Sequence, residues 1–467
     1  MSSYVPKSII IIGAGIAGLA CAIPLSRQGH NVTILESKPE LNEFGASIGI
    51  QPNGVKILKA WGLGPTFTSL VEPQPSTSIH DGHTGALLGT LTSNAHSTNR
   101  VRYGEDTWTV HRADYQRILA DYAVSHGARI LFSSHVTRID TATITVHLFN
   151  DTTLSADLII GADGMRSATR ASIPSTSSIT PIKLSEDCSR CSVPKERMVS
   201  NPLLAPLLAS KKGMIYTTPG KYILTWPLYP GRPYDVVTCV QRESTVPPGQ
   251  WGIVADSKEM AKDFDDFCPE VRELLANVDQ CIRWALGELP ALSSCRSEDG
   301  RIVLVGDAWH AMIPHSASGG NSAVEDGACL GECVAYALEN GFDIPDATKA
   351  FEAIRKPRVE RMQVASHDGM GFLSAGGEEK EKRDAYLASR LEVDAEEVKR
   401  PEEERRKDPK PKANMNAPFP SPPYLAWLYQ YDAVGEARGW CQDHMGKGGR
   451  EVENVLVAEG INGVQAF

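Results

Sequence analysis

Several features are missing from these 467 residues, and each absence argues against a class of protein. Lysine and arginine (47) are fewer than aspartate and glutamate (57), and the formal net charge of -10 argues against a nucleic-acid partner, because such partners are bound by basic side chains that neutralise phosphates. No uninterrupted apolar run is long enough to cross a bilayer, so we expect no membrane partner. The N-terminus lacks the basic flank and cleavage site of a signal peptide. We therefore predict a cytoplasmic, globular protein.

The ten cysteines also lack a dense, short-spaced framework, which fits a reducing compartment. Cys188 and Cys191 have the spacing of a metal or redox pair, but no second pair accompanies them. His80, His83 and His96 share neither a helix face nor a metal-ligand spacing. We expect no metal site, and we find no Ser-His-Asp set, no P-loop and no repeat of solenoid length.

The strongest positive feature lies in the first forty residues. An apolar run at Ile9–Ile12 precedes a GxGxxG pattern at residues 13–18, a helical stretch follows to Gln28, and a second apolar run ends at Glu36. This order of strand, glycine turn, helix and strand with a terminal acid is the setting that a dinucleotide-binding turn requires. The sequence therefore predicts a Rossmann-like nucleotide site.

Each glycine of this turn has its own physical task. Gly13 makes the tight turn, Gly15 lets the backbone approach a pyrophosphate, and Gly18 lets the helix pack closely on the strand. The helix N-terminus then presents N–H groups and the positive end of its dipole to the phosphates. Glu36 can accept hydrogen bonds from an adenosine ribose.

Two later stretches repeat the pattern of a buried strand followed by glycine and an acid. They are Leu158–Gly164 and Arg301–Asp307, and Asp307 would lie at the carboxyl end of its strand, where open α/β sheets hold ligands. Gly319-Gly320-Asn321 precedes a long helix and forms a second candidate anion site. Arg112 lies near the start of another helix, where a cation gains nothing from the dipole, so we expect it to contact a phosphate or carboxylate elsewhere.

The middle of the chain has a different period. Between about residues 180 and 243, apolar side chains alternate, which predicts antiparallel strands at 214–216, 222–226 and 236–240. Tyr222, Leu224 and Trp226 share one face, which favours simple packing over a substrate wall. Residues 264–276 and 278–286 are predicted to form helices.

The last hundred residues begin with a stretch of dense mixed charge at 376–412. We expect a solvated helix or a disordered linker there, without a specific partner. Beyond it, four aromatic residues provide enough apolar surface to dock back on the body of the protein: Tyr424, Trp427, Tyr429 and Tyr431.

The three glycine motifs, in this order and approximate spacing over about residues 5–370, resemble the FAD-dependent single-component (group A) aromatic hydroxylases, in particular salicylate hydroxylase-like enzymes of fungal secondary metabolism. The resemblance implies an α/β fold with a Rossmann-like FAD-binding domain, an antiparallel-sheet substrate domain and a helical C-terminal extension. The implied boundaries are 1–75, 100–180 and 290–370 for the first, 76–99 and 181–289 for the second, and 371–467 for the third, with the charged linker at 376–412.

The resemblance also assigns cofactor contacts. It implies that Glu36 binds the adenosine ribose of FAD, that Asp307 binds the ribityl chain, and that Asp163 belongs to a motif used by both FAD and NAD(P)H. Arg112 and Gly49 would lie on the flavin side. The remaining implied contacts are the first glycine turn and the loop against the flavin ring: Gly13, Ala14, Gly15, Ala17, Gly18, Pro314, Gly319, Gly320 and Asn321.

By the same resemblance, Arg190 and Tyr222 match an arginine–tyrosine pair of fungal polyketide and indole hydroxylases and would act on the substrate. The implied reaction uses NAD(P)H to reduce FAD and O2 to form a flavin C4a-hydroperoxide, which hydroxylates or epoxidises an electron-rich aromatic or indole-type molecule. Trp226 and the Ser318–Gly320 loop depart from the family pattern, and both departures leave the substrate open.

Two other functions stay open on the sequence alone. A plain NAD-dependent dehydrogenase would explain the first turn but would leave Asp163 and Asp307 without a task. A non-catalytic protein on the same fold, like the Rab escort and GDP-dissociation inhibitor group, would lack the intact set of flavin motifs. Flavin absorbance of the purified protein would separate these possibilities.

Overall fold

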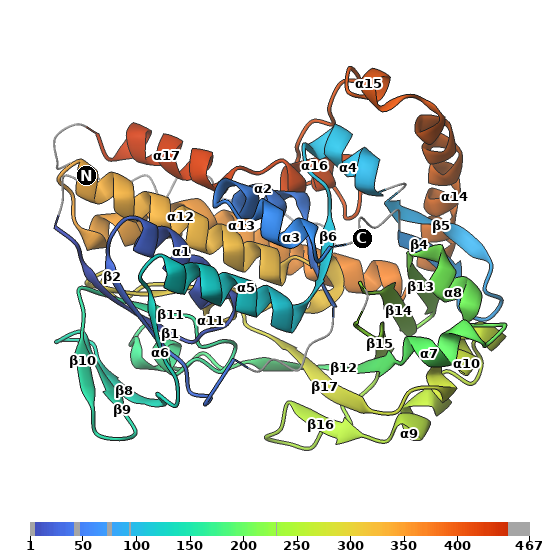
Figure 1. Ribbon diagram of the computed structural model, residues 1–467, viewed down its shortest axis with the longest axis horizontal. Coiled ribbons are helices and arrows are strands. Elements are labelled where there is room, and N and C mark those ends of the chain that lie inside the picture. Colours follow the sequence, from blue (N-terminus) through green and yellow to red (C-terminus); the bar gives the residue numbers. More distant parts are fainter. Residues whose placement is uncertain (1–4, 42–46, 72–76, 93–94, 230, 447–467) are drawn as a thin grey trace.

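The computed structural model describes residues 5–41, 47–71, 77–92, 95–229 and 231–446. Its two main sheets lie in opposite halves of the molecule (Figure 1). The first is parallel and five-stranded, in the order β18-β11-β1-β2-β7. Its strands are β1 (Ser8–Ile12), β2 (Asn31–Leu35), β7 (Arg129–Leu131), β11 (Leu158–Gly161) and β18 (Ile302–Leu304). The β-branched run Ile9–Ile12 is almost entirely buried, as expected of a strand covered on both faces.

Helices cover the parallel sheet. Beside it, α1 (Ile16–Arg27) packs against both α5 (Arg112–Ser125) and α12 (Gly319–Glu339). A small antiparallel sheet of β8 (Val136–Asp140), β9 (Thr145–Leu148) and β10 (Thr153–Ser155) lies at the same end of the molecule (Figure 1). This half has the Rossmann-like architecture that the sequence predicts. The shorter helical elements of the chain up to residue 316 are α2 (Pro52–Ala60), α3 (Gly64–Thr68), α6 (Ala168–Ser172), α11 (Asp307–His310), the 3-10 turn η1 (Pro314–Ser316), and α4 (Ala95–Tyr103), which lies beside α16 near β5 (Figure 1).

The second sheet has eight strands in the order β16-β17-β12-β15-β14-β13-β4-β5. All neighbours are antiparallel except β13 and β4. The predicted strands are confirmed as β13 (Gly213–Thr218), β14 (Lys221–Pro227) and β15 (Tyr234–Gln241). The others are β4 (Thr77–Asp81), β5 (Leu87–Thr92), β12 (Ile182–Val193), β16 (Gly252–Ala255) and β17 (Cys281–Glu288), and one face is covered by α7 (Lys195–Val199), α8 (Ala205–Ser210), α9 (Ser257–Lys262) and α10 (Pro269–Ala276).

The prediction of a helix over residues 278–286 is wrong. This segment is β17, which pairs with β12 on one side and β16 on the other. Its side chains alternate between buried Cys281, Arg283 and Ala285 and half-buried Ile282 and Trp284. An apolar run of this length fits either structure, and pairing with two strands decided it.

The C-terminal part is helical, with α13 (Ile344–Leu373), α14 (Gly377–Lys399), α15 (Glu402–Arg405), α16 (Pro422–Tyr429) and α17 (Ala433–His444). The charged stretch forms α14 along the edge strand β5 (Figure 1). Leu387 of α14 is fully buried, and Arg383 donates to Thr217 Oγ1 at 3.1 Å. Of the two structures expected for this stretch, the helix is the one that forms, whereas the lack of a specific partner and the domain boundaries stay predictions. Among the described helices, none is both long and apolar enough to cross a membrane.

A two-stranded sheet of β3 (Ser47–Ile50) and β6 (Trp108–His111) belongs to the Rossmann-like half and reaches toward the eight-stranded sheet. Ser47 N donates to Asp235 Oδ2 of β15 at 2.8 Å, and its hydroxyl donates to the same oxygen. Burial raises the pKa of Asp235, although the bonds from Ser47 act in the opposite direction. This contact joins the two halves beside Gly49.

Candidate functional site

The first glycine turn lies between β1 and α1, as predicted. Gly13 has φ +104°, and a Cβ there would lie 2.5 Å from the Ala162 carbonyl oxygen. A Cβ on Gly18 would overlap the Gly13 carbonyl oxygen. At Gly15 a Cβ would meet no protein atom within 4 Å. Gly13 and Gly18 are thus required by the protein's own backbone, whereas Gly15 leaves open the space that a nucleotide phosphate needs.

Glu36 follows β2 and lies against the same turn. Its Oε2 accepts a hydrogen bond from Ala14 N at 3.0 Å, and its Oε1 accepts one from Lys38 N at 2.9 Å. On the other side of the turn, Gln116 Nε2 of α5 donates to the Ala14 carbonyl oxygen at 2.8 Å. Two bonds thus fix Ala14, and the carboxylate lies where a ribose bound at the turn would meet it.

In the second glycine turn, the acidic side chain of Asp163 forms hydrogen bonds within its own loop. Asp163 accepts from Ser167 Oγ at 2.5 Å and from Thr169 N at 3.0 Å, and so holds the start of α6. Arg170 is buried and donates to the Met165 carbonyl at 2.7 Å and to the Ala308 carbonyl at 3.0 Å. This arginine therefore joins the second turn to the third one, and Asp163 shapes the loop through its own bonds.

The third turn exposes its acid. Gly306 has φ +55°, and a Cβ there would lie 2.6 Å from Ala17 Cβ of α1. Its N–H donates to Asp326 Oδ2 at 2.9 Å. Asp307 is the first residue of α11, has an exposed side chain and lies at the carboxyl end of β18. It directly follows Gly306, the residue that contacts Ala17. The topology thus brings Asp307 to the same edge of the parallel sheet as the first turn.

The start of α12 is tied to β3 through Asn321. Its Oδ1 accepts from Gln51 N at 2.9 Å, and its Nδ2 donates to the Gly49 carbonyl at 3.0 Å. A Cβ on Gly320 would lie 2.8 Å from Ile48 Cδ1, so Gly320 allows the close approach of the two elements. These contacts bring Gly49 together with the loop that continues back through Gly319 to Pro314.

Arg112 is also near this place. It begins α5 directly after β6, and β6 pairs with β3 so that Gly49 lies opposite Thr109. The structure thus brings the predicted cofactor residues to the edge where β3, α5 and α12 meet the ends of the parallel strands. Their contacts with a cofactor stay a prediction.

One face of the eight-stranded sheet turns toward these elements. Arg190 of β12 lies opposite Val237 of β15 and Ile282 of β17, and Leu224 of β14 lies opposite Val237. The Arg190 guanidinium carbon lies 5.4 Å from the Trp284 ring centroid. Unlike the core of the sheet, this patch is only half-buried; it comprises Arg190, Leu224, Trp226, Val237, Ile282 and Trp284.

Two contacts fix this face to β3 and to the 3-10 turn η1, which carry or adjoin predicted cofactor residues. Asp235 bonds to Ser47 at one end, and at the other the Tyr222 hydroxyl bonds to His315 Nδ1, directly after Pro314. Tyr222 pairs with Cys239, and Val237 lies between Asp235 and Cys239 on β15. Arg190, opposite Val237, is therefore placed between the two anchors. Tyr222 is packed in a hydrophobic cluster, and a contact of this face with a substrate stays a prediction.

The Tyr222 contact continues into a buried chain that the sequence analysis missed. His315 Nε2 lies 2.9 Å from Glu186 Oε2, and all three side chains are buried. Burial raises the pKa of the Tyr222 hydroxyl well above its usual value. Glu186 shares a strand face with Arg190 four residues later, and His315 follows Pro314, but 93 residues separate Tyr222 from His315 and no local pattern joins them.

The same place is the one group in the described ranges whose side chains could hold a metal ion. Ligand atoms of Glu186, Cys239 and His315 lie within 4.8 Å of one another. Both nitrogens of His315 already have protein partners, whereas Glu186 Oε1 is buried without one. Cys188 and Cys191 are buried on opposite faces of β12, and neither they nor the other eight cysteines form a disulfide.

Residues 7–366 match the model of the FAD binding domain family. The chain belongs to this family of flavoproteins, and FAD is its cofactor. The open space at Gly15, the carboxylate of Glu36 and the exposed Asp307 fit that cofactor. The predicted fold class is confirmed, and so is the resemblance to FAD-dependent monooxygenases.

Its relatives include enzymes of fungi and bacteria. The FAD-dependent monooxygenase OpS4 of Beauveria bassiana (strain ARSEF 2860) is 27% identical over 92% of this chain and 96% of its own length. A salicylate hydroxylase of Pseudomonas putida is 28% identical over 76% of this chain and 83% of its own. Among solved structures, CtdE in complex with FAD and a substrate has a TM-score of 0.75 at 22% identity, with 94% of this chain and 98% of that one covered. This flavoprotein thus has the same fold as CtdE over nearly its whole length.

Proposed function

We propose that this flavoprotein uses NAD(P)H and O2 to hydroxylate or epoxidise an electron-rich aromatic or indole-type small molecule, in the biosynthesis of a polyketide or indole alkaloid. The observation that carries the proposal is the half-buried face around Arg190, held against the flavin-binding elements at both ends. When bound, FAD supplies the hydride acceptance and oxygen activation that side chains lack. The protein binds and orients the substrate, and it excludes water from the site.

The cofactor is held by the three glycine turns and the start of α12. Backbone N–H groups around Gly15 bind the pyrophosphate, while Glu36 and Asp307 accept bonds from the hydroxyl groups of the ribose and the ribityl chain. The N–H groups of Gly319 and Gly320 begin a 21-residue helix and favour electron-rich oxygen atoms of the flavin ring. Asp163 and Arg170 act indirectly, by fixing the turns.

Arg190 binds the substrate in this proposal. Its guanidinium can donate charge-assisted hydrogen bonds to a phenolic or carbonyl oxygen, which are roughly twice as strong as neutral ones. Trp284 lies beside it, and Leu224 and Trp226 lie on the same face two strands away, which gives the aromatic and apolar surface on which a planar ring packs. A guanidinium beside a phenol also favours the ionised, more electron-rich ring.

The Tyr222–His315–Glu186 chain handles a proton. Because burial disfavours ionisation of Tyr222, its hydroxyl can pass a proton onward while it stays neutral itself. A neutral His315 accepts at Nδ1 and donates from Nε2 to Glu186, and on gaining a proton it forms an ion pair with that carboxylate. A proton released from a substrate hydroxyl can thus be held inside the protein.

The test compares Arg190→Ala, Tyr222→Phe and Glu186→Gln with Arg197→Ala, whose exposed side chain pairs with Asp279. A set of phenols, salicylates and indole alkaloids is screened by NAD(P)H oxidation, O2 uptake and product analysis. We expect full FAD occupancy in all variants, and the first three to lose product by about 10²–10⁴-fold, as for loss of acid–base help. Wild-type turnover in those three, or NAD(P)H oxidation without O2 uptake, would contradict the proposal.

A further inference from the structure

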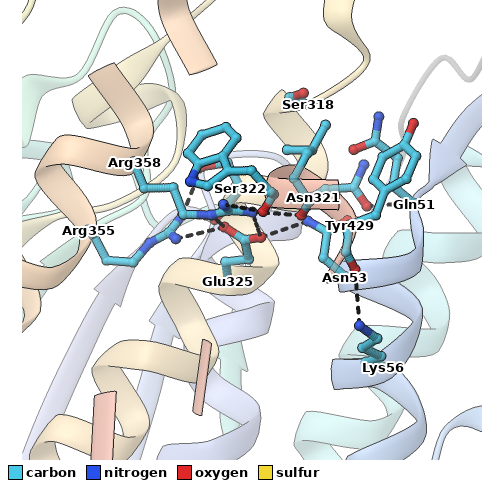
Figure 2. Close-up of polar contacts among 12 residues, drawn as sticks. Gln51, Asn53, Lys56, Ser318, Asn321, Ser322, Glu325, Arg355, Arg358 and Tyr429 are labelled. Atoms are coloured by element: carbon cyan, nitrogen blue, oxygen red, sulfur yellow. Dashed lines mark hydrogen bonds and ion pairs between the residues drawn. The ribbon is translucent and has the colours of Figure 1, made fainter. Parts of the chain in front are cut away.

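A buried ion cluster lies between the cofactor elements and the C-terminal segment, residues 413–445. The cluster consists of Glu325 and Asp326 of α12 and Arg355 and Arg358 of α13 (Figure 2 labels all but Asp326). Three of the four side chains are completely buried, and Arg358 nearly so. Two carboxylates face two guanidinium groups, and His310 Nε2 also lies 2.7 Å from Asp326 Oδ2. Burial would raise the pKa of Glu325, but Arg358 and Arg355 outweigh it and lower that pKa.

The two carboxylates of the cluster bond to elements that carry or adjoin predicted FAD contacts. Asp326 Oδ2 accepts from Gly306 N at 2.9 Å, directly before Asp307. Glu325 Oε1 accepts from Asn53 Nδ2 of α2 at 2.6 Å. The first turn of α2 follows Gln51, which is bonded to Asn321 at the start of α12. Both carboxylates are therefore joined to the turns that bind FAD.

Arg358 connects Glu325 with the C-terminal segment. It donates to both oxygens of Glu325, at 2.8 and 2.7 Å. The same guanidinium donates to the carbonyl oxygens of Trp427 at 3.2 Å and of Leu428 at 2.9 Å, in the last turn of α16. A cation is favoured there, because the C-terminal carbonyls form the negative end of the helix dipole. One side chain thus bonds both the cofactor side and the C-terminal segment.

Two further contacts fix the segment at the same place. The Tyr431 ring lies over Arg358, with 3.7 Å from its centroid to the guanidinium carbon, and the Trp427 ring lies at 4.6 Å. Lys56 Nζ of α2 donates to the Tyr429 carbonyl at 3.0 Å. The end of α16 is thus held jointly by α13 and α2.

We propose that docking of the C-terminal segment on Arg358 holds α2 and the start of α12 in the geometry that binds FAD. Arg358 is in this view a positioning residue for the cofactor, although it does not touch the predicted FAD contacts itself. Without its guanidinium, Glu325 keeps Arg355 alone, and α2 loses the fixed acceptor for Asn53. Weaker FAD binding follows, because removing one partner of a buried ion pair leaves a buried charge without compensation.

Arg361 provides a matched control on the same helix. It donates to the carbonyls of Met415 at 2.6 Å and Ala417 at 3.2 Å, and it lies 4.9 Å from the Tyr424 ring centroid. It therefore holds the same segment, but its ion pair is with the half-exposed Asp368 and not with Glu325. Arg361→Gln should loosen residues 415–417, and it leaves the end of α16 bonded to Arg358 and the carboxylates of α12 paired.

The experiment measures the FAD dissociation constant of the stripped protein by flavin fluorescence, with thermal midpoint and visible flavin circular dichroism in parallel. We expect Arg358→Gln to weaken FAD binding on the order of tenfold, within the usual range of coupling between sites. Arg361→Gln should bind FAD like wild type, and Arg358→Lys should recover part of the loss. Equal effects of the two glutamine variants, or wild-type binding in Arg358→Gln, would overturn the proposal.

A second variant decides the matter if Arg358→Gln does not fold. Tyr431→Leu removes the ring over the guanidinium and leaves the bonds of Arg358 in place. Weaker FAD binding with an altered flavin circular dichroism spectrum supports the coupling, and wild-type values for both contradict it. These measurements read cofactor binding and not turnover, so they hold whichever substrate the enzyme uses.

Discussion

At the scale of single residues, the glycines of the first turn differ in what requires them. Gly18 is required by the fold, because a Cβ there would overlap the Gly13 carbonyl oxygen. Gly15 faces open space, so its lack of a side chain serves only a bound group. The same GxGxxG pattern thus combines a folding requirement with a binding requirement, and substitution can separate them.

We predict that Gly15→Ala leaves the thermal midpoint of the FAD-free protein within about 2–4 °C of wild type, the shift expected from roughly 1 kcal/mol. Its FAD affinity should fall clearly, because the added methyl group occupies the space where the pyrophosphate approaches. Gly18→Ala should lose stability even without FAD. The check is thermal unfolding of stripped protein together with flavin fluorescence titration; a destabilised FAD-free Gly15→Ala protein would contradict the assignment.

At the scale of elements, α14 shows how a charged sequence can still be a packed helix. Most of its charges face water, and only a few positions such as Leu387 and Arg383 face the protein. Leu387 enters the cluster that also contains Tyr222 and Ile313, next to Gly89 of β5, where a Cβ would lie 2.7 Å from that of Leu387. The helix therefore packs on the edge strand β5 of the eight-stranded sheet.

Leu387→Ala should lower the free energy of unfolding by roughly 2–5 kcal/mol, the usual range for a leucine removed from a core. Lys382→Ala is the matched control, because its ion pair with Glu379 is exposed and such surface changes stay within about 0.5 kcal/mol. Urea denaturation of both variants provides the measurement. If Leu387→Ala unfolded like the control, α14 would be the loose linker that its composition indicates.

At the scale of the whole molecule, stability should depend on pH through His30, which lies just before β2. Its Nδ1 accepts a hydrogen bond from Lys7 N at 3.2 Å, which a protonated ring cannot do. Burial, together with the charge of Lys7, lowers the pKa of His30 from 6.5 to about 4. Between these two values the unfolded chain binds a proton that the folded chain does not.

Folding stability should therefore fall as the pH is lowered from about 6.5 to about 4 and change no further from this group below that. The total loss is at most about 3.4 kcal/mol, because the pKa of His30 differs by about 2.5 units between the two states and each unit corresponds to about 1.36 kcal/mol. Urea unfolding of wild type, His30→Gln and the exposed control His126→Gln over this range tests it. The free energy of unfolding should depend less steeply on pH in His30→Gln but not in His126→Gln. An unchanged pH dependence in His30→Gln would refute the assignment.

The first turn, the parallel sheet and the FAD assignment could be predicted because they depend on neighbouring residues. A glycine at a fixed offset between an apolar run and a helix constrains the local backbone directly. Glu36 and Asp307 follow their strands at short range, and Gly319 and Gly320 are the first residues of α12. The alternation of apolar side chains likewise predicted β13, β14 and β15.

Only the tertiary structure decided the rest. Residues 278–286 fit a helix or a strand equally, until pairing with β12 and β16 made them β17. Asp163 also accepts hydrogen bonds from Ser167 and Thr169 at the start of α6, and its contact with a cofactor stays a prediction. Tyr222 meets His315, and Arg358 meets the end of α16, across long stretches of chain. Such contacts arise from packing between elements, and a local pattern carries no information about which distant side chain will complete a buried hydrogen bond.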